Sequence, residues 1–158
     1  MDSPQAKTIF FKRSHFATHL PVGALYSPAH YWMVRDPDGT WRVGFSKFAV
    51  RMLGDLVDQA FDVPEGGLVQ SGKIIGWIEG FKAISDIYCA IDGTFCGGNP
   101  SLKGHLELVN DAPYDAGWLY RANGEPDRNC MPAQDYVNLL NATIDRMLSQ
   151  QKDLPPSA

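Results

Sequence analysis

The sequence predicts a mainly β domain with a short internal helix and a longer C-terminal helix. Two observations favour this fold class. Turn sequences built from glycine, proline, asparagine and aspartate recur about every ten residues between positions 36 and 126. Short runs rich in β-branched and aromatic residues lie between these turns. Such spacing is typical of a β-sandwich or barrel made of short strands.

Eight runs are predicted to be strands, and four of them form two hairpins. Residues 30–35 and 41–45 flank an Asp-Pro-Asp-Gly sequence, which favours a tight turn. Residues 74–79 and 86–91 flank residues 80–85 and predict the second hairpin. The remaining predicted strands are residues 8–12, 55–61, 106–109 and 118–121.

Two helices are predicted, and both have recognisable ends. Ser46 can cap a short helix that runs to Leu53 and ends at Gly54. The longer helix is predicted from Pro132 to Leu148, because proline suits a first helical turn and apolar residues then recur at helical spacing. We expect this apolar face to dock on the domain's own core. Its members are Tyr136, Leu139, Leu140, Ile144, Met147 and Leu148.

The composition excludes several classes of protein. The chain has 158 residues, 44% hydrophobic and 20% charged, which fits one folded domain and no membrane span. No apolar run approaches the roughly 20 residues that a bilayer helix needs. Residues 1–7 lack the apolar core of a secretory signal. The net charge is −4 and no basic stripe is visible, which argues against nucleic-acid binding.

The cysteines and histidines predict no metal or disulfide site. Cys89, Cys96 and Cys130 are odd in number, so free thiols in a reducing cytoplasm are expected. Their spacing does not match a C-x-x-C motif, and we expect Cys89 to be buried and Cys130 to be exposed. His15 and His19 form only a two-ligand set, which is incomplete for a metal.

Lys82 is the most informative residue of the chain. It lies in a short turn between two predicted strands, with no acidic residue immediately beside it. One interpretation is an ordinary solvated lysine. The other is that a hairpin tip presents the amine to an enzyme that grips the tip from both sides, as attachment of a cofactor requires.

The segment from Glu79 to Tyr88 (EGFKAISDIY) resembles the lipoylation hairpin of the glycine cleavage system H-protein family of lipoyl carriers. The resemblance covers about residues 24–150, which sets apart an N-terminal extension (1–23) and a tail (151–158). It rests on YSPAHYW at 26–32, VGFSKFA at 43–49, LGD at 53–55, NPSL at 99–102, LVNDAPY at 108–114 and GWL at 117–119.

The resemblance implies a barrel-sandwich hybrid, in which two antiparallel sheets present the lysine at a hairpin tip. It implies lipoic acid in amide linkage to Lys82 and a carrier that catalyses nothing itself. A biotin carrier is disfavoured, because the neighbours of Lys82 are Phe81 and Ala83 where biotin carriers usually have methionines.

The resemblance also implies roles for residues around the arm. Glu79 and Asp86 belong to the surface that the attaching lipoate ligase or lipoyl transferase and the partner enzymes read. Gly72 and Gly93 bracket Lys82 and permit the tight backbone of the hairpin base.

Departures from the family pattern bear on the pathway. Glu79-Gly80-Phe81 stands where glycine-cleavage members usually have Glu-Ser-Val, and thiols follow the hairpin. These features resemble lipoate-binding proteins of cytoplasmic sulfur oxidation, which serve a heterodisulfide-reductase-like complex. Cys89, Cys96 and Cys130 are then candidate redox thiols that exchange with the dithiolane. We therefore expect a cytoplasmic, monomeric carrier of sulfur-bound intermediates and electrons.

Three alternatives remain open. The first is an H protein that carries the aminomethyl group of glycine between glycine decarboxylase, aminomethyltransferase and dihydrolipoamide dehydrogenase. The second is a thiol enzyme that uses Cys96 or Cys130. The third is an unlipoylated interaction module.

Overall fold

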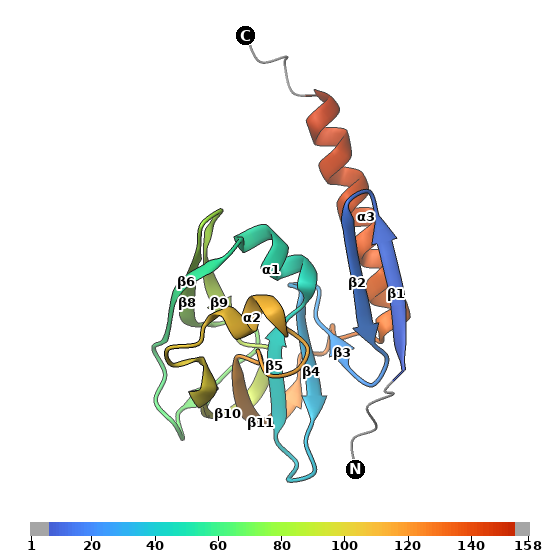
Figure 1. The fold of residues 1–158 in the computed structure, drawn as a ribbon. Helices are drawn as coiled ribbons and strands as arrows, with labels where there is room; N and C mark the ends of the chain where they lie inside the picture. The colour runs from blue at the N-terminus through green and yellow to red at the C-terminus, as the bar shows by residue number, and fades with distance from the viewer. Residues whose placement is uncertain (1–6, 154–158) are drawn as a thin grey trace.

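The computed structural model describes residues 7–153. Eleven strands form three antiparallel sheets in this part of the chain, which confirms a mainly β fold (Figure 1). A six-stranded sheet has the order β3 (Leu25–Tyr26), β4 (Tyr31–Arg35), β5 (Trp41–Phe45), β11 (Tyr120–Pro126), β10 (Ile91–Gly98) and β7 (Leu68–Val69). A three-stranded sheet has the order β6 (Leu56–Phe61), β8 (Ile74–Gly80) and β9 (Ile84–Tyr88).

The third sheet is a hairpin of β1 (Thr8–Arg13) and β2 (Phe16–Pro21). It lies against the C-terminal helix α3 (Ala133–Asp153), apart from the two larger sheets (Figure 1). Two short helices, α1 (Lys47–Leu53) and α2 (Glu107–Asp111), and the single 3-10 turn η1 (Pro100–Leu102) complete the described chain.

Two hydrophobic clusters hold these elements together. The main core gathers side chains from the six-stranded and three-stranded sheets, among them the fully buried Met33, Val43, Ile78, Ile87 and Ile91. The second cluster joins the β1–β2 hairpin to α1, β4 and α3. Its members include Phe11, Phe16, Leu20, Trp32, Phe48, Tyr136 and Leu140.

The predicted helices are confirmed, with one extension. The Ser46 hydroxyl accepts a hydrogen bond from the Ala49 amide, and Gly54 ends α1 with a φ of +77°. The predicted apolar face of α3 packs on the second cluster except for Leu148, which is exposed, and the rings of Tyr26 and Tyr136 stack there at 4.7 Å. The predicted tail begins too early, because α3 continues to Asp153. Residues 154–158 lie outside the described residues. Residues 1–6 also lie outside them, and these are most of the segment in which we expected no secretory signal.

One predicted strand is wrong. Residues 107–109 are the start of α2 and Leu106 is its N-cap, and the Ala112 amide closes this helix on the Leu108 carbonyl at 2.8 Å. A four-residue apolar run fits a strand or a buried helical turn equally well, and only the contacts of the folded chain decide between them. The prediction for 86–91 also joined two strands, since β9 ends at Tyr88 and β10 begins at Ile91.

Candidate functional site

Lys82 lies at the tip of the β8–β9 hairpin, as the sequence predicts. The turn consists of Phe81, Lys82 and Ala83, and the Gly80 amide donates to the Ala83 carbonyl at 2.9 Å to close it. The tip stands at the same end of the molecule as α1 (Figure 1). A short loop of three residues leaves little freedom in the main chain around the lysine.

The tip is fixed to the corner between α1 and β6 by its backbone. The Lys82 amide donates to the Leu53 carbonyl at 2.9 Å, and the Phe81 amide donates to the Asp55 carbonyl at 3.0 Å. A Cβ on Gly80 would collide with the Leu53 carbonyl oxygen, and a Cβ on Gly54 would lie 2.9 Å from Cγ of Lys82. Two glycines therefore permit the close approach that holds the lysine backbone in place.

The Lys82 side chain, in contrast, is exposed and almost unconstrained. Its Nζ donates one long hydrogen bond of 3.5 Å to the Arg51 carbonyl. Among the ion pairs formed within residues 7–153, none involves Lys82. This fits covalent modification, because acylation of the amine removes no buried contact or ion pair and can retain one N–H for the Arg51 carbonyl.

A groove of about 490 Å³ runs beside Lys82, between α1, the hairpin tip and α2. Asn110 shapes it in a way that sequence reasoning missed. Its side-chain amide donates to the Gly54 carbonyl at 3.1 Å, and its Oδ1 accepts from the Leu56 amide at 3.2 Å. The groove is lined by Lys47, Val50, Arg51, Gly54, Asp55, Phe81, Lys82, Asn110 and Asp111.

Apolar side chains surround the tip and are open to solvent. Phe81 is 82% exposed and Ile84 is 71% exposed. Met52 at the end of α1 and Val57 on β6 are also exposed large hydrophobic residues. Apolar groups gathered around a modifiable amine are typical of a surface that another protein covers.

Three carboxylates share the outer face of the β6–β8–β9 sheet. Asp58 pairs with Glu79 across β6 and β8, and Asp86 pairs with Trp77 across β8 and β9. Because Trp77 and Glu79 are two residues apart on β8, their side chains point to the same side. The structure thus brings together Glu79 and Asp86, as predicted, and adds Asp58, which no sequence motif had indicated.

Gly72 and Gly93 lie at the base of the β-structure and do not border the Lys82 groove. Gly72 has a φ of +86° in the turn before β8, and its amide donates to the Cys89 carbonyl at 2.8 Å. Gly93 on β10 packs against the backbone of Asn123 and Gly124. Both serve the backbone geometry of the sheets.

The three cysteines are free and none of them lines the Lys82 groove. Cys89 is buried as predicted, and burial raises the pKa of its thiol. The expectation for Cys130 is wrong. It is half-buried, its thiol contacts Met33 Sδ at 3.4 Å, and burial, with a smaller effect of Asp127, raises the pKa of Cys130 to about 12. Cys96 on β10 is exposed. Thiols with raised pKa values are poor nucleophiles, which disfavours a thiol enzyme based on Cys130.

Residues 7–153 contain no group of three or more histidine, cysteine or acidic side chains placed to hold a metal ion. Within the same residues, no helix combines the length and apolar character needed to cross a membrane.

Comparison with known proteins agrees with this geometry. Residues 24–143 match the family of the glycine cleavage H-protein. A glycine cleavage system H protein of Micrococcus luteus is 43% identical over 103 residues, which cover 64% of this chain and 79% of the relative. One from Escherichia coli is 34% identical over 136 residues, which cover 85% of this chain and 99% of the relative.

The fold comparison leads to the same group. The crystal structure of a glycine cleavage system H protein from Mycobacterium marinum superimposes with a TM-score of 0.70 at 28% identity. It covers 77% of this chain and 99% of that protein. The predicted barrel-sandwich hybrid is thereby confirmed.

Fold and presented lysine together define a carrier protein that serves a multienzyme system and has no catalytic activity of its own. The chain belongs to the glycine cleavage H-protein family. Lipoic acid, attached covalently to a lysine, is the cofactor of this family.

Proposed function

We propose that this protein is the H protein of a glycine cleavage system and that Lys82 is its lipoylated residue. The observation that carries the proposal is that the Lys82 amine is exposed while its main chain is fixed in place. Two main-chain hydrogen bonds and the close packing at two glycines hold that main chain. Membership of the H-protein family supports the pathway. The cargo is then the aminomethyl group of glycine, carried on the lipoyl-lysine arm.

The main chain and the side chain at the hairpin tip have different roles in a carrier. Bound lipoic acid supplies a dithiolane whose sulfurs accept a group or two electrons. The backbone bonds of Phe81 and Lys82 hold the root of the arm, while the free side chain lets its end reach different active sites. Tethering raises the effective concentration of the cargo at each partner.

The predicted preference for sulfur oxidation is not supported. The relatives described above are all glycine cleavage H proteins, and the family match covers most of the chain. Of the thiols that follow the hairpin and motivated the sulfur prediction, Cys89 is buried in the main core and Cys96 is exposed, and neither lines the groove beside Lys82. A heterodisulfide-reductase-like partner therefore has no support, and we favour glycine cleavage.

The partners that follow are glycine decarboxylase, aminomethyltransferase, dihydrolipoamide dehydrogenase and a lipoate ligase. We infer that they recognise the exposed Phe81 and Ile84 together with the carboxylates Glu79 and Asp86. Phe81 and Ile84 flank Lys82 and are exposed, and neither Glu79 nor Asp86 forms an ion pair among residues 7–153. A carrier unit that starts at residue 24 and runs to the end of α3 at Asp153, and a location in the cytoplasm, where these enzymes would meet it, complete the proposal.

Intact-protein mass spectrometry tests the modified residue. The chain is incubated with a lipoate ligase, lipoic acid and ATP, and we expect a mass increase of one lipoyl group. Lys82→Arg should show no increase. Lys73→Arg is the matched control, because Lys73 is another exposed lysine in a turn next to β8. A modified Lys82→Arg protein would contradict the assignment.

A second incubation tests the pathway. Lipoylated protein with its arm in the oxidised, disulfide form is incubated with glycine and a glycine decarboxylase. Glycine should release CO2 while its aminomethyl carbon bonds to one sulfur, the S–S bond breaks and the other sulfur becomes a thiol. The protein should then gain the mass of glycine less CO2, and omission of glycine should abolish the gain. A lipoylated protein that stays unloaded under these conditions would refute the glycine cleavage assignment while leaving the carrier assignment intact.

A further inference from the structure

The β1–β2 hairpin precedes the part of the chain that matches the family. The family match begins at residue 24, and the M. marinum structure is covered almost completely by only 77% of this chain. This hairpin packs on α3 through β1 and on α1 through β2, and it turns back at Ser14 and His15 (Figure 1). Its turn reaches the same end of the molecule as the Lys82 tip.

Side-chain contacts fix this hairpin firmly to the domain. The rings of Phe16 and Phe48 meet edge to face at 5.6 Å, which joins β2 to α1. Arg13 donates to the α3 residues Asp145 at 2.8 Å and Asn141 at 3.1 Å. The hairpin is therefore a rigid part of the surface.

The hairpin and α1 are continuous with the lysine site through Arg51. The Arg51 guanidinium donates to the His15 carbonyl at 3.3 Å, and the Arg51 carbonyl accepts from Nζ of Lys82. Lys47, one turn earlier on α1, lines the groove beside Lys82. An enzyme that takes the arm at Lys82 from this side must approach α1 and the hairpin turn as well.

These two segments carry cations and no carboxylates. Residues 7–21 and 47–53 include Lys7, Lys12, Arg13, Lys47 and Arg51, and neither contains aspartate or glutamate. Only Arg13 forms an ion pair within residues 7–153. The whole chain has a net charge of −4, so this basic face stands out against its surroundings. No basic stripe is visible in the sequence, because the cations lie in two separate segments that folding brings together.

Acidic groups lie on the other sides of the lysine. Asp55 and Asp111 line the groove on the side of β6 and α2, and Glu79 and Asp86 lie on the outer sheet face. Lys82 therefore lies between an acidic side and a basic side, and the β1–β2 hairpin and α1 form the basic side.

We propose that the basic face formed by α1 and the β1–β2 hairpin is a docking surface for the enzyme that loads the arm, through an acidic patch beside that enzyme's active-site entrance. The proposal rests on the proposed function. Its two grounds are the cations Lys12, Lys47 and Arg51, which form no ion pair among residues 7–153 and favour an acidic partner, and the direct link of Arg51 to Lys82. Such a face acts mainly on the rate of encounter, so its effect declines as salt screens the charges.

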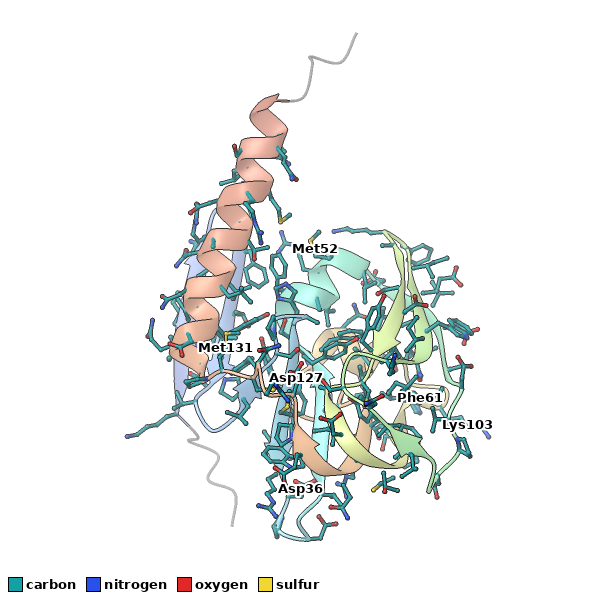
Figure 2. The ribbon with its side chains drawn as sticks, turned by 180° about the vertical axis from the view of Figure 1, so that it is seen from behind. Asp36, Met52, Phe61, Lys103, Asp127 and Met131 are labelled. Carbon is teal, nitrogen blue, oxygen red and sulfur yellow. The ribbon has the colours of Figure 1, made fainter. Side chains whose placement is uncertain are left out.

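The test compares charge variants of the lipoylated full-length protein as substrates of the glycine decarboxylase from the same organism. The variant Lys12→Glu with Arg51→Glu should lower kcat/KM by roughly tenfold at low salt, with kcat little changed. At high salt the kcat/KM values of the variant and of the unchanged protein should become equal. Lys103→Glu is the matched control, because it makes the same type of charge change far from the Met52 end of α1 (Figure 2).

Three results would overturn the proposal. The first is a double variant that matches Lys103→Glu at low and high salt. The second is a loss of kcat/KM that high salt does not restore, which would indicate damage to the fold. The third is concentration-dependent self-association of the unchanged protein in sedimentation that the double variant abolishes, since the occupant would then be a second copy.

Failure of the proposed function is distinguishable from failure of this proposal. If the glycine decarboxylase does not load the unchanged protein, the same three proteins are compared in their unlipoylated form as substrates of a lipoate ligase. That enzyme must also bind at Lys82. The same salt-dependent loss would then support the docking face, and equal rates for the three proteins would overturn it.

Discussion

The two hairpins next to α1 are held by opposite means. The β8–β9 tip is fixed by main-chain hydrogen bonds to Leu53 and Asp55, and its side chains remain in solvent. The β1–β2 hairpin is fixed by side chains, with Phe16 and Arg13 turned inward. Backbone attachment leaves every side chain at the tip available to other enzymes. Side-chain attachment leaves only the outward face of a hairpin available.

This difference also separates what each region tolerates. The position of the β8–β9 tip depends on the absence of side chains at Gly54 and Gly80. It does not depend on the size of Phe81, whose side chain is exposed. The β1–β2 hairpin depends on the volume of its buried rings. Substitutions at the two hairpins should therefore separate loss of stability from loss of modification.

The largest expected effect is on the hairpin held by side chains. Phe16→Ala removes a ring that is only 8% exposed and packs on Phe11 and Phe48, so we expect a loss of about 3–5 kcal/mol in unfolding free energy. Urea denaturation measures it. Phe10→Ala is the control, because Phe10 is 57% exposed and its loss should cost under about 1 kcal/mol. Equal losses would show that the hairpin is not packed by its inward rings.

A smaller loss of stability, with a larger loss of modification, is expected at the tip. Gly80→Ala forces a methyl group against the Leu53 carbonyl, which should cost about 1–3 kcal/mol and displace Lys82. The rate of lipoylation, measured by mass spectrometry, should fall more than stability explains. Gly23→Ala has open space at its Cβ and serves as the control. A Gly80→Ala protein lipoylated at the unchanged rate would refute the role of close backbone packing.

The smallest effect appears only when the pH changes. His30 contacts Phe48 of α1 and Tyr136 of α3. Its Nδ1 shares a 2.7 Å hydrogen bond with the Tyr136 hydroxyl, and burial lowers the pKa of His30 to about 4. The unfolded chain binds this proton near pH 6.5, so protonation favours unfolding as the pH falls from 6.5 towards 4. Between pH 7.5 and pH 5 we expect His30 to account for about 2 kcal/mol of lost stability.

Urea denaturation at these two pH values measures the loss. His30→Asn should remove it, since asparagine does not titrate and tolerates the φ of +72° at this position. His19→Asn, at an exposed histidine of β2, should keep the pH dependence. An unchanged pH dependence in His30→Asn would exclude this histidine as its source.

Local sequence signals predicted the elements whose ends are set by nearby residues. The Ser46 and Gly54 caps predicted α1, and the turn around Lys82 predicted the hairpin and its tip. The residues that position the tip were less accessible. Asn110 was hidden by the wrong strand at 106–109, and nothing local indicates that Gly80 faces Leu53. Contacts between distant segments decide both.

The same limit applies to surfaces. The sequence indicated Glu79 and Asp86 because they lie within the matching motif, whereas Asp58 joined them only through the register of β6 on β8. The basic face needed two segments, residues 7–21 and 47–53, that no run of charge connects. A sequence shows the charges of a region, and folding decides which of them become neighbours.

The end of α1 has a consequence for how the cofactor is delivered. The carbonyls of Arg51 and Leu53, at the close of that helix, both accept hydrogen bonds from Lys82. A partner enzyme that binds α1 therefore also fixes the orientation of the Lys82 main chain, because α1 and the hairpin tip move together. Movement of the arm relative to the partner then comes from rotations about the side-chain bonds of Lys82 and of the attached group, while the main chain at the root of the arm keeps its orientation.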